Sequence, residues 1–415
     1  MDMESQDTNN VIWSNIIGIS LSLATMIPFI QATSIYWQVF LLELEATPLV
    51  ISIMFSVSSI ISSISMIYGG YLADRYGRKK LIVMFTFFMS LTFLAMYYAA
   101  SWREIFIIYA LQGLASIYSP ALDAIIADSA PVQKRGKMYS IIFLFPRIMV
   151  IIAPYIALLF IKKYGLVYGV RRLMILAFIT CMLASLIRAI SLRETLEIKK
   201  KEMILSSNAE YGYREVLGYI VKNMTRLLIF VGILMFMFGM IYLQQLYVLV
   251  YLQVDYETWA YINMIYIAIS IMLTIPSDII VDKIGRKTPL IISMALAIIC
   301  QAILAFAPIN KAGLYVTISF ILSAFANFLG FTAYISIEAD LLPHEQRGRA
   351  YAVLRIFESA TSILGVIVDG ILYVLHPRLP FIGATILSIL GFIISTILKE
   401  TLPRELNSPS LNVQS

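Results

Sequence analysis

The stretch GYLADRYGRKK, residues 70–80, recurs about half a chain later as SDIIVDKIGRK, residues 277–287. Each copy is a small basic island between two long apolar stretches. The residues that recur 208 positions apart are Asp74, Gly77, Arg78 and Lys79 in the first copy and Asp282, Gly285, Arg286 and Lys287 in the second. An internal repeat built from membrane spans is typical of a transporter with two related halves.

Two further pairs of strings repeat in the same order. The longer pair is ADSAPVQKRGK, residues 127–137, and ADLLPHEQRGR, residues 339–349, and the shorter pair is RETLE, residues 193–197, and KETLP, residues 399–403. In the longer pair, Asp128 and Arg135 recur as Asp340 and Arg347. Three ordered pairs at offsets of 206 to 212 positions indicate a duplication, with convergent basic loops as the alternative.

The composition is that of a membrane protein. Of 415 residues, 60% are hydrophobic and 13% are charged, and the mean hydropathy is +0.85. A soluble domain is about half apolar and about a quarter charged. The formal charge of +6 would suggest a nucleic-acid partner in a soluble protein. Here the positive-inside bias of membrane loops explains it, so the lipid bilayer is the expected partner and nucleic acid is not.

Twelve apolar runs are long enough to cross a bilayer, which takes about 20 residues of helix. Spans this apolar must be helical, because lipid offers no partner for free backbone groups. The sequence therefore predicts an all-α membrane protein of two pseudo-symmetric six-helix bundles. The bundle of residues 12–192 holds runs at roughly 12–41, 48–73, 81–100, 104–130, 137–161 and 172–192, and the bundle of residues 226–399 holds runs at roughly 226–252, 258–281, 289–308, 312–341, 349–375 and 379–398.

The polar segments fix the expected orientation. They are an N-terminal tail of residues 1–11, a linker of residues 193–225 and a C-terminal tail of residues 400–415. With both termini inside, the inner segments carry 21 Lys and Arg and the outer loops carry 7, which predicts cytoplasmic termini in a plasma-membrane protein. Apolar residues at helical spacing in 213–224 predict a short amphipathic helix on the membrane surface, or an early start of span seven.

No enzyme chemistry is predicted. The two cysteines, Cys181 and Cys300, lie inside apolar runs, and the two histidines, His344 and His376, are far apart in the sequence. This pattern gives no disulfide framework and no metal-ligand spacing. We find no nucleophile–base pair and no phosphate-binding loop, so the sequence predicts no cofactor, no metal and no ATP-driven pumping.

The repeated strings resemble those of the major facilitator superfamily. The signature of that family between spans two and three reads roughly G-x-L-A-D-R-x-G-R-K. The residues that fit it are Gly70, Leu72, Ala73, Asp74, Arg75, Gly77, Arg78 and Lys79. The second copy is degraded, as is usual in the family. The resemblance covers nearly the whole chain and implies a secondary transporter that works by alternating access.

The motif predicts a cytoplasmic gate. Gly77 supplies the backbone freedom that a tight loop needs, and Asp74 can face a helix N-terminus, which in the family belongs to span eleven. Arg78 and Arg75 can pair with carboxylates, and Asp128 is the expected partner. Such a latch would hold the outward-facing state; alternatively, these basic residues only fix the topology. The predicted gate comprises Gly70, Asp74, Arg75, Gly77, Arg78, Asp128, Arg135, Asp282, Gly285, Arg286, Asp340 and Arg347.

Charges inside the spans predict proton coupling, because a buried charge usually faces a cavity or a partner. Asp123 in span four and Arg147 in span five are expected at similar depth, so we expect them to pair. Arg355 and Glu358 share one helical face. Glu358 near the midplane is the predicted proton carrier, with Arg355 tuning its protonation and Asp369 as a second carrier. A structural ion pair that orients helices is the alternative.

Polar residues in the middle of the spans predict the substrate cavity. In the family, spans one, four, seven and ten line it. Amide and aromatic groups suit a mostly apolar or hydroxylated organic solute. The predicted cavity residues are Gln31, Gln112, Tyr242, Gln244, Gln245, Asn263 and Asn327.

One departure from the family weakens antiport. Its drug/proton antiporters often carry R-x-x-Q-G in span four, where this chain has Tyr109 at the arginine position, followed by Gln112 and Gly113. The favoured function is nevertheless secondary, proton-coupled transport of a small organic solute by a monomer, with efflux of drug-like or metabolite compounds ahead of sugar or organic-acid uptake. A uniporter and a non-transporting membrane receptor are the alternatives.

Overall fold

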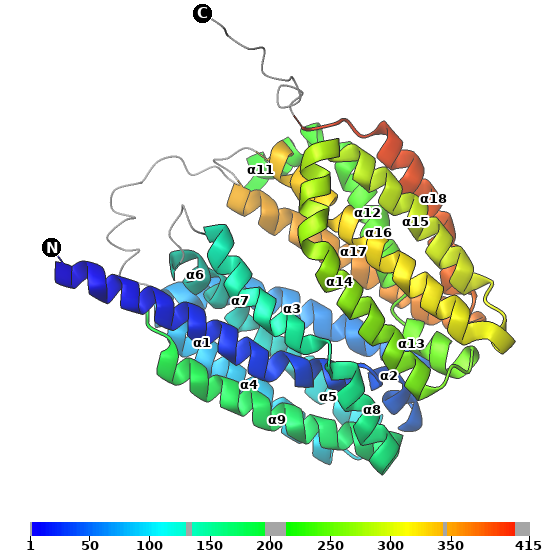
Figure 1. The fold of residues 1–415 in the computed structure, drawn as a ribbon, viewed down its shortest axis with the longest axis horizontal. Coiled ribbons are helices and arrows are strands. Elements are labelled where there is room, and N and C mark those ends of the chain that lie inside the picture. Colours follow the sequence, from blue (N-terminus) through cyan, green and yellow to red (C-terminus); the bar gives the residue numbers. More distant parts are fainter. Residues whose placement is uncertain (1, 130–134, 196–212, 343–346, 403–415) are drawn as a thin grey trace, which may run out of the picture.

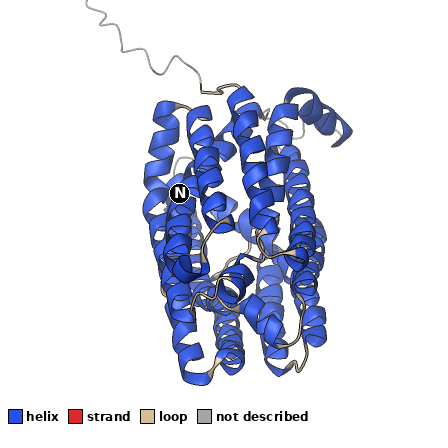
Figure 2. Ribbon diagram, turned by 90° about the vertical axis from the view of Figure 1, so that its right-hand side faces the viewer, coloured by secondary structure: helices blue, strands red, loops and turns tan. Residues whose placement is uncertain are grey.

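The computed structural model describes residues 2–129, 135–195, 213–342 and 347–402. Within these ranges the chain forms helices and loops and no strand (Figure 2). Ten helices of the described chain are long and apolar enough to cross a membrane, and one bent pair supplies an eleventh. The 29-residue helix α14 (Tyr256–Ile284) completes a set of twelve spans, as the sequence predicted.

The first six spans follow the predicted runs closely. They are α1 (Asp2–Ser34) with α2 (Trp37–Glu43), α3 (Pro48–Tyr76), α4 (Arg78–Tyr98), α5 (Trp102–Gly113) with η1 (Leu114–Ile117) and α6 (Tyr118–Ser129), α7 (Arg135–Val150) with α8 (Ala153–Tyr164), and α9 (Leu166–Ser191). The first helix begins ten residues before the predicted start, so helix continues through the segment expected to be a tail.

The last six spans repeat this order. They are α12 (Thr225–Gly239) with α13 (Gln244–Leu246) and the π-helix η3 (Tyr247–Tyr251), α14, α15 (Lys287–Ala305), α16 (Ala312–Leu341) after the short η4 (Ile309–Lys311), α17 (Arg347–Leu375) and α18 (Leu379–Ile397). Figure 1 shows the two sets as neighbouring bundles. Twelve is an even number of spans, so α1 begins and α18 ends at one end of the bundles. We call that end the terminal face and the other end the opposite face.

The predicted amphipathic helix is present as α11 (Tyr213–Asn223), which lies at 88° to α12. Val216 and Ile220 are buried against the second bundle, whereas Leu217 and Val221 are exposed. Span seven therefore does not begin early. A sharp bend between an amphipathic helix and an apolar helix is the geometry expected where a chain runs along a membrane surface before entering it.

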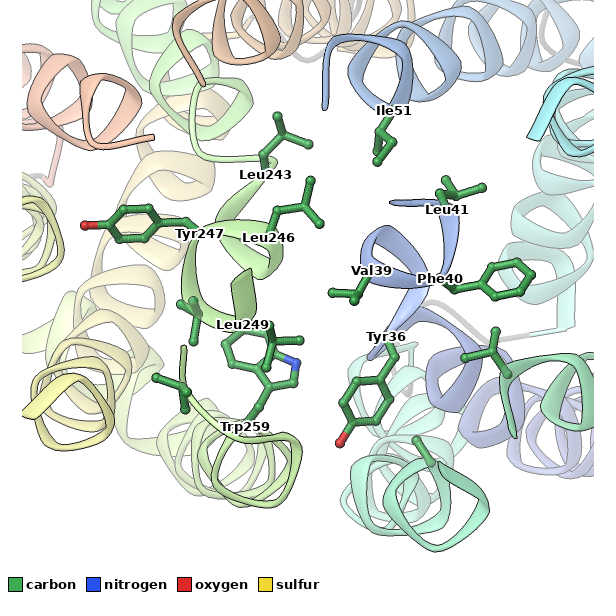
Figure 3. Packing of buried hydrophobic residues seen from close by; sticks show 14 of the residues in the cluster. Tyr36, Val39, Phe40, Leu41, Ile51, Leu243, Leu246, Tyr247, Leu249 and Trp259 are labelled. Atoms are coloured by element: carbon green, nitrogen blue, oxygen red, sulfur yellow. The ribbon is translucent and has the colours of Figure 1, made fainter. Parts of the chain in front are cut away.

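The two bundles share an apolar cluster near the opposite face. In Figure 3, Val39 of α2 faces Leu246 and Leu249 of the second bundle, with Tyr36 and Trp259 next to them. All five side chains are buried. Each bundle also has a core of its own, around α1, α6 and α9 in the first and around α12, α15 and α16 in the second. The halves are thus separately packed and joined mainly at one end.

Both spans that meet at this cluster are broken. Span one is interrupted between α1 and α2, and span seven between α12 and α13, where the sequence predicted continuous runs. The helices after the breaks begin at Trp37 and Gln244, 207 positions apart, which matches the offset of the sequence repeats. The duplication therefore extends to an irregular feature of the backbone that the apolar pattern did not reveal.

A glycine follows the second span of each half. Gly77 has φ +92° and Gly285 has φ +91°, in a region that residues with a side chain occupy at a cost of about 1–3 kcal/mol. A Cβ atom on Gly285 would lie 2.5 Å from Oε2 of Glu400, and one on Gly77 would lie 2.9 Å from Oε2 of Glu194. The backbone angle favours glycine here, and a Cβ atom would also have to displace the glutamate carboxylate, which explains why the repeat keeps glycine.

We expect Gly285→Ala to destabilise the protein. The strained backbone and the clash with Glu400 should lower the free energy of unfolding by about 1–3 kcal/mol. Gly70→Ala is the matched control, because a Cβ atom there meets no atom within 4 Å. Thermal unfolding of both variants in nanodiscs, followed by intrinsic fluorescence, checks this. Equal midpoints for the two variants would contradict it.

Candidate functional site

At the terminal face, the three repeated strings of the first half converge on one ion pair. The buried Arg78 pairs with Asp128 and also donates to Oγ1 of Thr195 at 3.0 Å. The Thr195 hydroxyl in turn donates to Oδ2 of Asp128 at 3.1 Å. Oε2 of Glu194 accepts the backbone N–H of Lys79 at 3.0 Å, at the start of α4. The start of α4, the end of α6 and the chain after α9 are thereby tied together.

The second half builds the same cluster. Arg286 lies 2.7 Å from Oδ2 of Asp340, and the Thr401 hydroxyl donates to that oxygen at 2.6 Å. The Glu400 carboxylate accepts the backbone N–H groups of Arg286 and Lys287 at 3.0 Å each. Burial raises the pKa of Glu400, but backbone N–H donors that include these two outweigh burial and hold that pKa below its usual range. Carboxylates at helix N-termini are stabilised in this way.

The predicted pair of Arg78 and Asp128 is therefore confirmed, and its copy recurs. The threonine and glutamate of each cluster, at positions 194–195 and 400–401, were not predicted to join these ion pairs, although the RETLE and KETLP repeat was their signal.

The predicted contact between the halves at this face is not made in this structure. Asp74, Arg75 and Asp282 are exposed, and within the described residues Asp74 has no hydrogen bond or ion pair. Among described partners, Arg75 bonds the hydroxyl of Tyr71, one turn away on the same helix, and lies over the ring of Tyr76. The clusters thus lie inside each half. Two predicted gate side chains fall outside the described part of the structure, those of Arg135 and Arg347.

At the opposite face, two glutamines bind the halves together. The backbone N–H of Gln38 donates to Oε1 of Gln245 at 2.8 Å, and Nε2 of Gln38 donates to the carbonyl oxygen of Tyr242 at 2.7 Å. Nε2 of Gln245 donates to the carbonyl oxygen of Ile35. The Gln38 side chain thus reaches the residue three positions before Gln245, and the Gln245 side chain reaches the residue three positions before Gln38. We call the pair Gln38 and Gln245 the glutamine clasp.

The clasp corrects one prediction. Gln245 was expected to line the cavity, but it is buried between the halves with 7% of its surface exposed, as is Gln38. Gln38 was missed, although it lies 207 positions before Gln245, at the offset of the repeat. Both glutamines follow a helix break, and their amides satisfy carbonyl groups that the breaks leave without helical partners.

Other bonds between the halves lie beside the clasp. Nε1 of Trp259 donates to the carbonyl oxygen of Ile35 at 3.0 Å, and the hydroxyl of Tyr36 donates to the backbone carbonyl oxygen of Tyr256 at 2.7 Å. Lys162 forms an ion pair with Glu257 at 2.5 Å. Every hydrogen bond that joins the halves between described residues lies at the opposite face. That face is therefore closed, and the terminal face is not bridged in the same way.

Asp369 satisfies the backbone at the break in span seven. Its Oδ2 accepts the N–H of Leu243 at 2.7 Å, and its side chain is 1% exposed. It lines neither of the two cavities described below. The position predicted for a second proton carrier thus holds a carboxylate that caps a broken helix, the use for which carboxylates are suited at helix N-termini.

The larger cavity has a volume of about 690 Å³ and lies mainly in the first half, closed on one side by α12 and α17. This volume falls within the usual range for small-molecule sites, roughly 300–1,000 Å³. Its wall is rich in hydroxyl groups, from Thr33, Ser34, Ser58, Ser59, Ser62, Ser63, Ser116, Ser119, Ser359 and Ser362. The serines of span two follow helical spacing in the string SVSSIISS, residues 56–63, so the sequence did contain a signal for this wall.

Glu358 is the charged residue in that wall. Its Oε1 accepts the hydroxyl of Tyr334, and its Oε2 accepts Arg355 at 2.5 Å, as the sequence predicted for Arg355. Arg355 also reaches Glu338 at 2.7 Å. Two carboxylates thus share one guanidinium, so the ionised cluster carries one uncompensated negative charge that a proton or a cation can neutralise.

Asp123 and Arg147 do not pair, contrary to prediction. Asp123 on α6 and Arg147 on α7 are both exposed, and the ion pairs between described residues do not include either of them. The reason is the packing of their helices. The α6 helix lies against α3 and α4, whereas α7 lies against α1 and approaches α14. Spans that follow each other in sequence need not face each other.

The predicted cavity residues are divided among several places. Gln112 lines the larger cavity. Asn327 lines a second, smaller cavity and donates to the hydroxyl of Tyr266 at 3.1 Å. The ring of Tyr242 lies 4.3 Å from that of Phe55, which lines the larger cavity. The predicted residues that line neither cavity are Gln31, Tyr242, Gln244, Gln245 and Asn263.

Comparison with known proteins agrees with this architecture. The family model for the Major Facilitator Superfamily matches residues 12–345. A Na(+), Li(+), K(+)/H(+) antiporter of Planococcus maritimus is 32% identical over 174 residues, 40% of this chain and 39% of that protein. The chain thus spans well under half the length of that relative.

Two further proteins are similar along most of the chain. Multidrug resistance protein 2 of Bacillus subtilis (strain 168) is 22% identical over 370 residues, 83% of this chain and 84% of that protein. The solved structure of a bacterial homologue of the human lysosomal transporter Spinster, inward-facing and occupied, has a TM-score of 0.71 and 13% identity over 92% of this chain and 95% of that one.

We expect Gln245→Ala to open the opposite face. Removing the Gln245 side chain leaves buried polar groups without partners, which destabilises the closed state by about 1–3 kcal/mol. The equilibrium between the closed and open states should then shift roughly 5- to 150-fold toward the open state. An introduced Ser58→Cys, in the larger cavity, should then react faster with an impermeant maleimide added at that face. The native Cys181 and Cys300 are buried. Gln301→Ala, another buried glutamine, is the control, and equal labelling rates in the two backgrounds would exclude a gating role for the clasp.

Proposed function

Because this chain belongs to the Major Facilitator Superfamily, we propose that it is a proton-coupled transporter of a small organic solute. The observation that carries the proposal is the placement of Glu358 in the wall of the larger cavity, bonded to Tyr334 and Arg355. A carboxylate in the cavity can exchange its proton with a solute that enters. Solute and proton then act on the same group.

The cluster around Glu358 offers a way to link protonation to conformation. Protonation of Glu358 weakens its attraction for Arg355 and leaves Arg355 with Glu338 as its remaining partner. Glu358 and Arg355 lie on α17, and Glu338 lies on α16, so the change acts on two helices at once. Small electrostatic changes are amplified when the surrounding helices have two stable packings.

Alternating access follows from the two faces. We assign the terminal face to the cytoplasm of the plasma membrane because the basic repeats gather there. The structure is then closed to the outside by the glutamine clasp. In the outward-facing state the clasp would open, and Asp74 and Arg75 of α3 would meet α17, completing the latch between the halves. The clusters within each half would stay intact, so each half would move as one body.

The wall of the larger cavity suits a partly apolar solute. Four methionines beside the hydroxyl groups supply an adaptable apolar surface. The described lining of this cavity has no Arg or Lys to bind an organic acid. The similarity to a protein named Multidrug resistance protein 2 adds support for efflux of drug-like or metabolite compounds ahead of sugar or organic-acid uptake.

Exchange of a monovalent cation for a proton is a second candidate. The specific observation is the surplus negative charge of the cluster of Glu338, Arg355 and Glu358, beside a wall of hydroxyl oxygens. Oxygen ligands of this type suit hard cations. A relative named as a Na(+), Li(+), K(+)/H(+) antiporter matches part of the chain, which is consistent with this candidate.

Proton flux in proteoliposomes tests the proposal. The vesicles contain the pH indicator pyranine, and the probes are ethidium, xylose, sodium and potassium. We expect addition of a transported probe to change the internal pH. Glu358→Gln should abolish the change, because an amide cannot carry the proton. Glu104→Gln, at an exposed carboxylate near the start of α5, is the control and should keep it.

The probes separate the candidates. A response to ethidium supports organic efflux, and a response to sodium or potassium alone supports cation exchange. A response that survives in Glu358→Gln, or solute flux with no movement of protons, would contradict proton coupling through this residue.

A further inference from the structure

The smaller cavity is built by both halves. It has a volume of about 270 Å³ and lies among α12, α14, α15 and α16 of the second half. The first half contributes one residue to its lining, Arg147 of α7. The α7 helix also approaches α14, which lines the same cavity. A molecule in this cavity would therefore touch both halves.

Most of the lining is apolar and aromatic. Phe238, Phe328 and Phe331 contribute rings, and Met235 and Met294 contribute flexible side chains that adapt to a ligand. The volume is close to the lower limit for small-molecule sites, which is roughly 300 Å³. It suits one compact body of about two aromatic rings. The hydrogen-bonded pair of Asn327 and Tyr266 adds a polar point on one wall.

Arg147 is a cation without a partner. Among the described residues it has neither an ion pair nor a hydrogen-bond acceptor, and the carboxylate expected to pair with it, Asp123, does not. Arg147 is twelve residues from the start of α7, which places it about 18 Å along the helix. Arg147 therefore lies within the apolar part of span five, where it lines the smaller cavity. A charge at this depth normally has a partner.

We propose that the smaller cavity binds an organic anion with an apolar body. The guanidinium of Arg147 can hold a carboxylate or sulfonate through two parallel hydrogen bonds, a geometry that arginine favours. The apolar body then packs among the phenylalanine rings of the second half. This arrangement matches the ligand to the one charge in the described lining and to the apolar character of the rest.

The two cavities have opposite electrostatic character. The larger cavity carries the surplus negative charge around Glu358, and the smaller carries Arg147. Met235 lines both, and Tyr334, which lines the smaller cavity, donates its hydroxyl to Glu358. An anion is therefore favoured in the smaller cavity and disfavoured in the larger one. Binding in the smaller cavity does not depend on proton coupling by Glu358.

The ligand also favours one conformation. Arg147 comes from the first half and the apolar wall from the second, so the anion binds best when the two halves have the arrangement seen here. A ligand shifts an equilibrium toward the state in which it makes more contacts. Bound anion should therefore favour the state in which the glutamine clasp is closed.

Equilibrium binding of radiolabelled 2-naphthoate to the protein in nanodiscs tests the site. Competition with unlabelled compounds compares 2-naphthoate with the neutral 2-naphthamide and the cationic 2-naphthylmethylamine. We expect the anion to bind at least tenfold more tightly than the amide, and the amine to bind most weakly. Arg147→Gln should remove the preference for the anion, and Arg147→Lys should keep part of it. Arg103→Gln, at an exposed arginine near the start of α5, should change nothing.

A second variant tests the place of binding. Ala297 lines the smaller cavity, and Ala297→Phe should fill it and weaken 2-naphthoate binding at least tenfold while Arg147 is retained. Equal affinity for naphthoate and naphthamide, an anion preference that survives Arg147→Gln, or unchanged affinity in Ala297→Phe would each overturn the proposal. No proton gradient is applied, so a chain that fails the pyranine experiment can still pass this one.

Discussion

The glutamine clasp is the interaction on which the observed state of the protein depends. Breaks in spans one and seven free backbone carbonyl groups in the buried contact between the halves, where each needs a partner. Gln38 and Gln245 supply those partners reciprocally, each from the opposite half. The bonds that satisfy the backbone are therefore also the bonds that close one face. Opening that face requires both broken spans to find other partners together, which makes the change cooperative.

The terminal clusters have the complementary role. Arg78 with Asp128, and Arg286 with Asp340, join three segments inside each half and leave the boundary between the halves free. Strong bonds within the halves and breakable bonds between them are what a rocking mechanism needs. The two cavities lie along that boundary, each with walls from both halves.

The sequence predicted the features that leave a repeated pattern of residues, and it missed those that depend on which way neighbouring helices face. Gly77 and the Arg78–Asp128 pair could be read from the repeat, because a glycine at a helix end and a charge pair leave a fixed pattern. The broken spans could not be predicted in this way. They are stabilised by hydrogen bonds from another helix, and these bonds leave no pattern of apolar residues in the sequence. Gln38 was missed for this reason. The prediction that Asp123 pairs with Arg147 was wrong, because depth in the membrane does not reveal which way a helix faces.

The most direct test measures distances at both faces of the protein by double electron–electron resonance between pairs of spin labels. Spin labels at Tyr76 and Ile284 report the terminal face, and labels at Arg103 and Lys311 report the opposite face; all four side chains are exposed. As pH or solute is varied, rigid rocking of two halves predicts that one distance lengthens whenever the other shortens. Two distances that lengthen together, or that vary independently, would contradict the account.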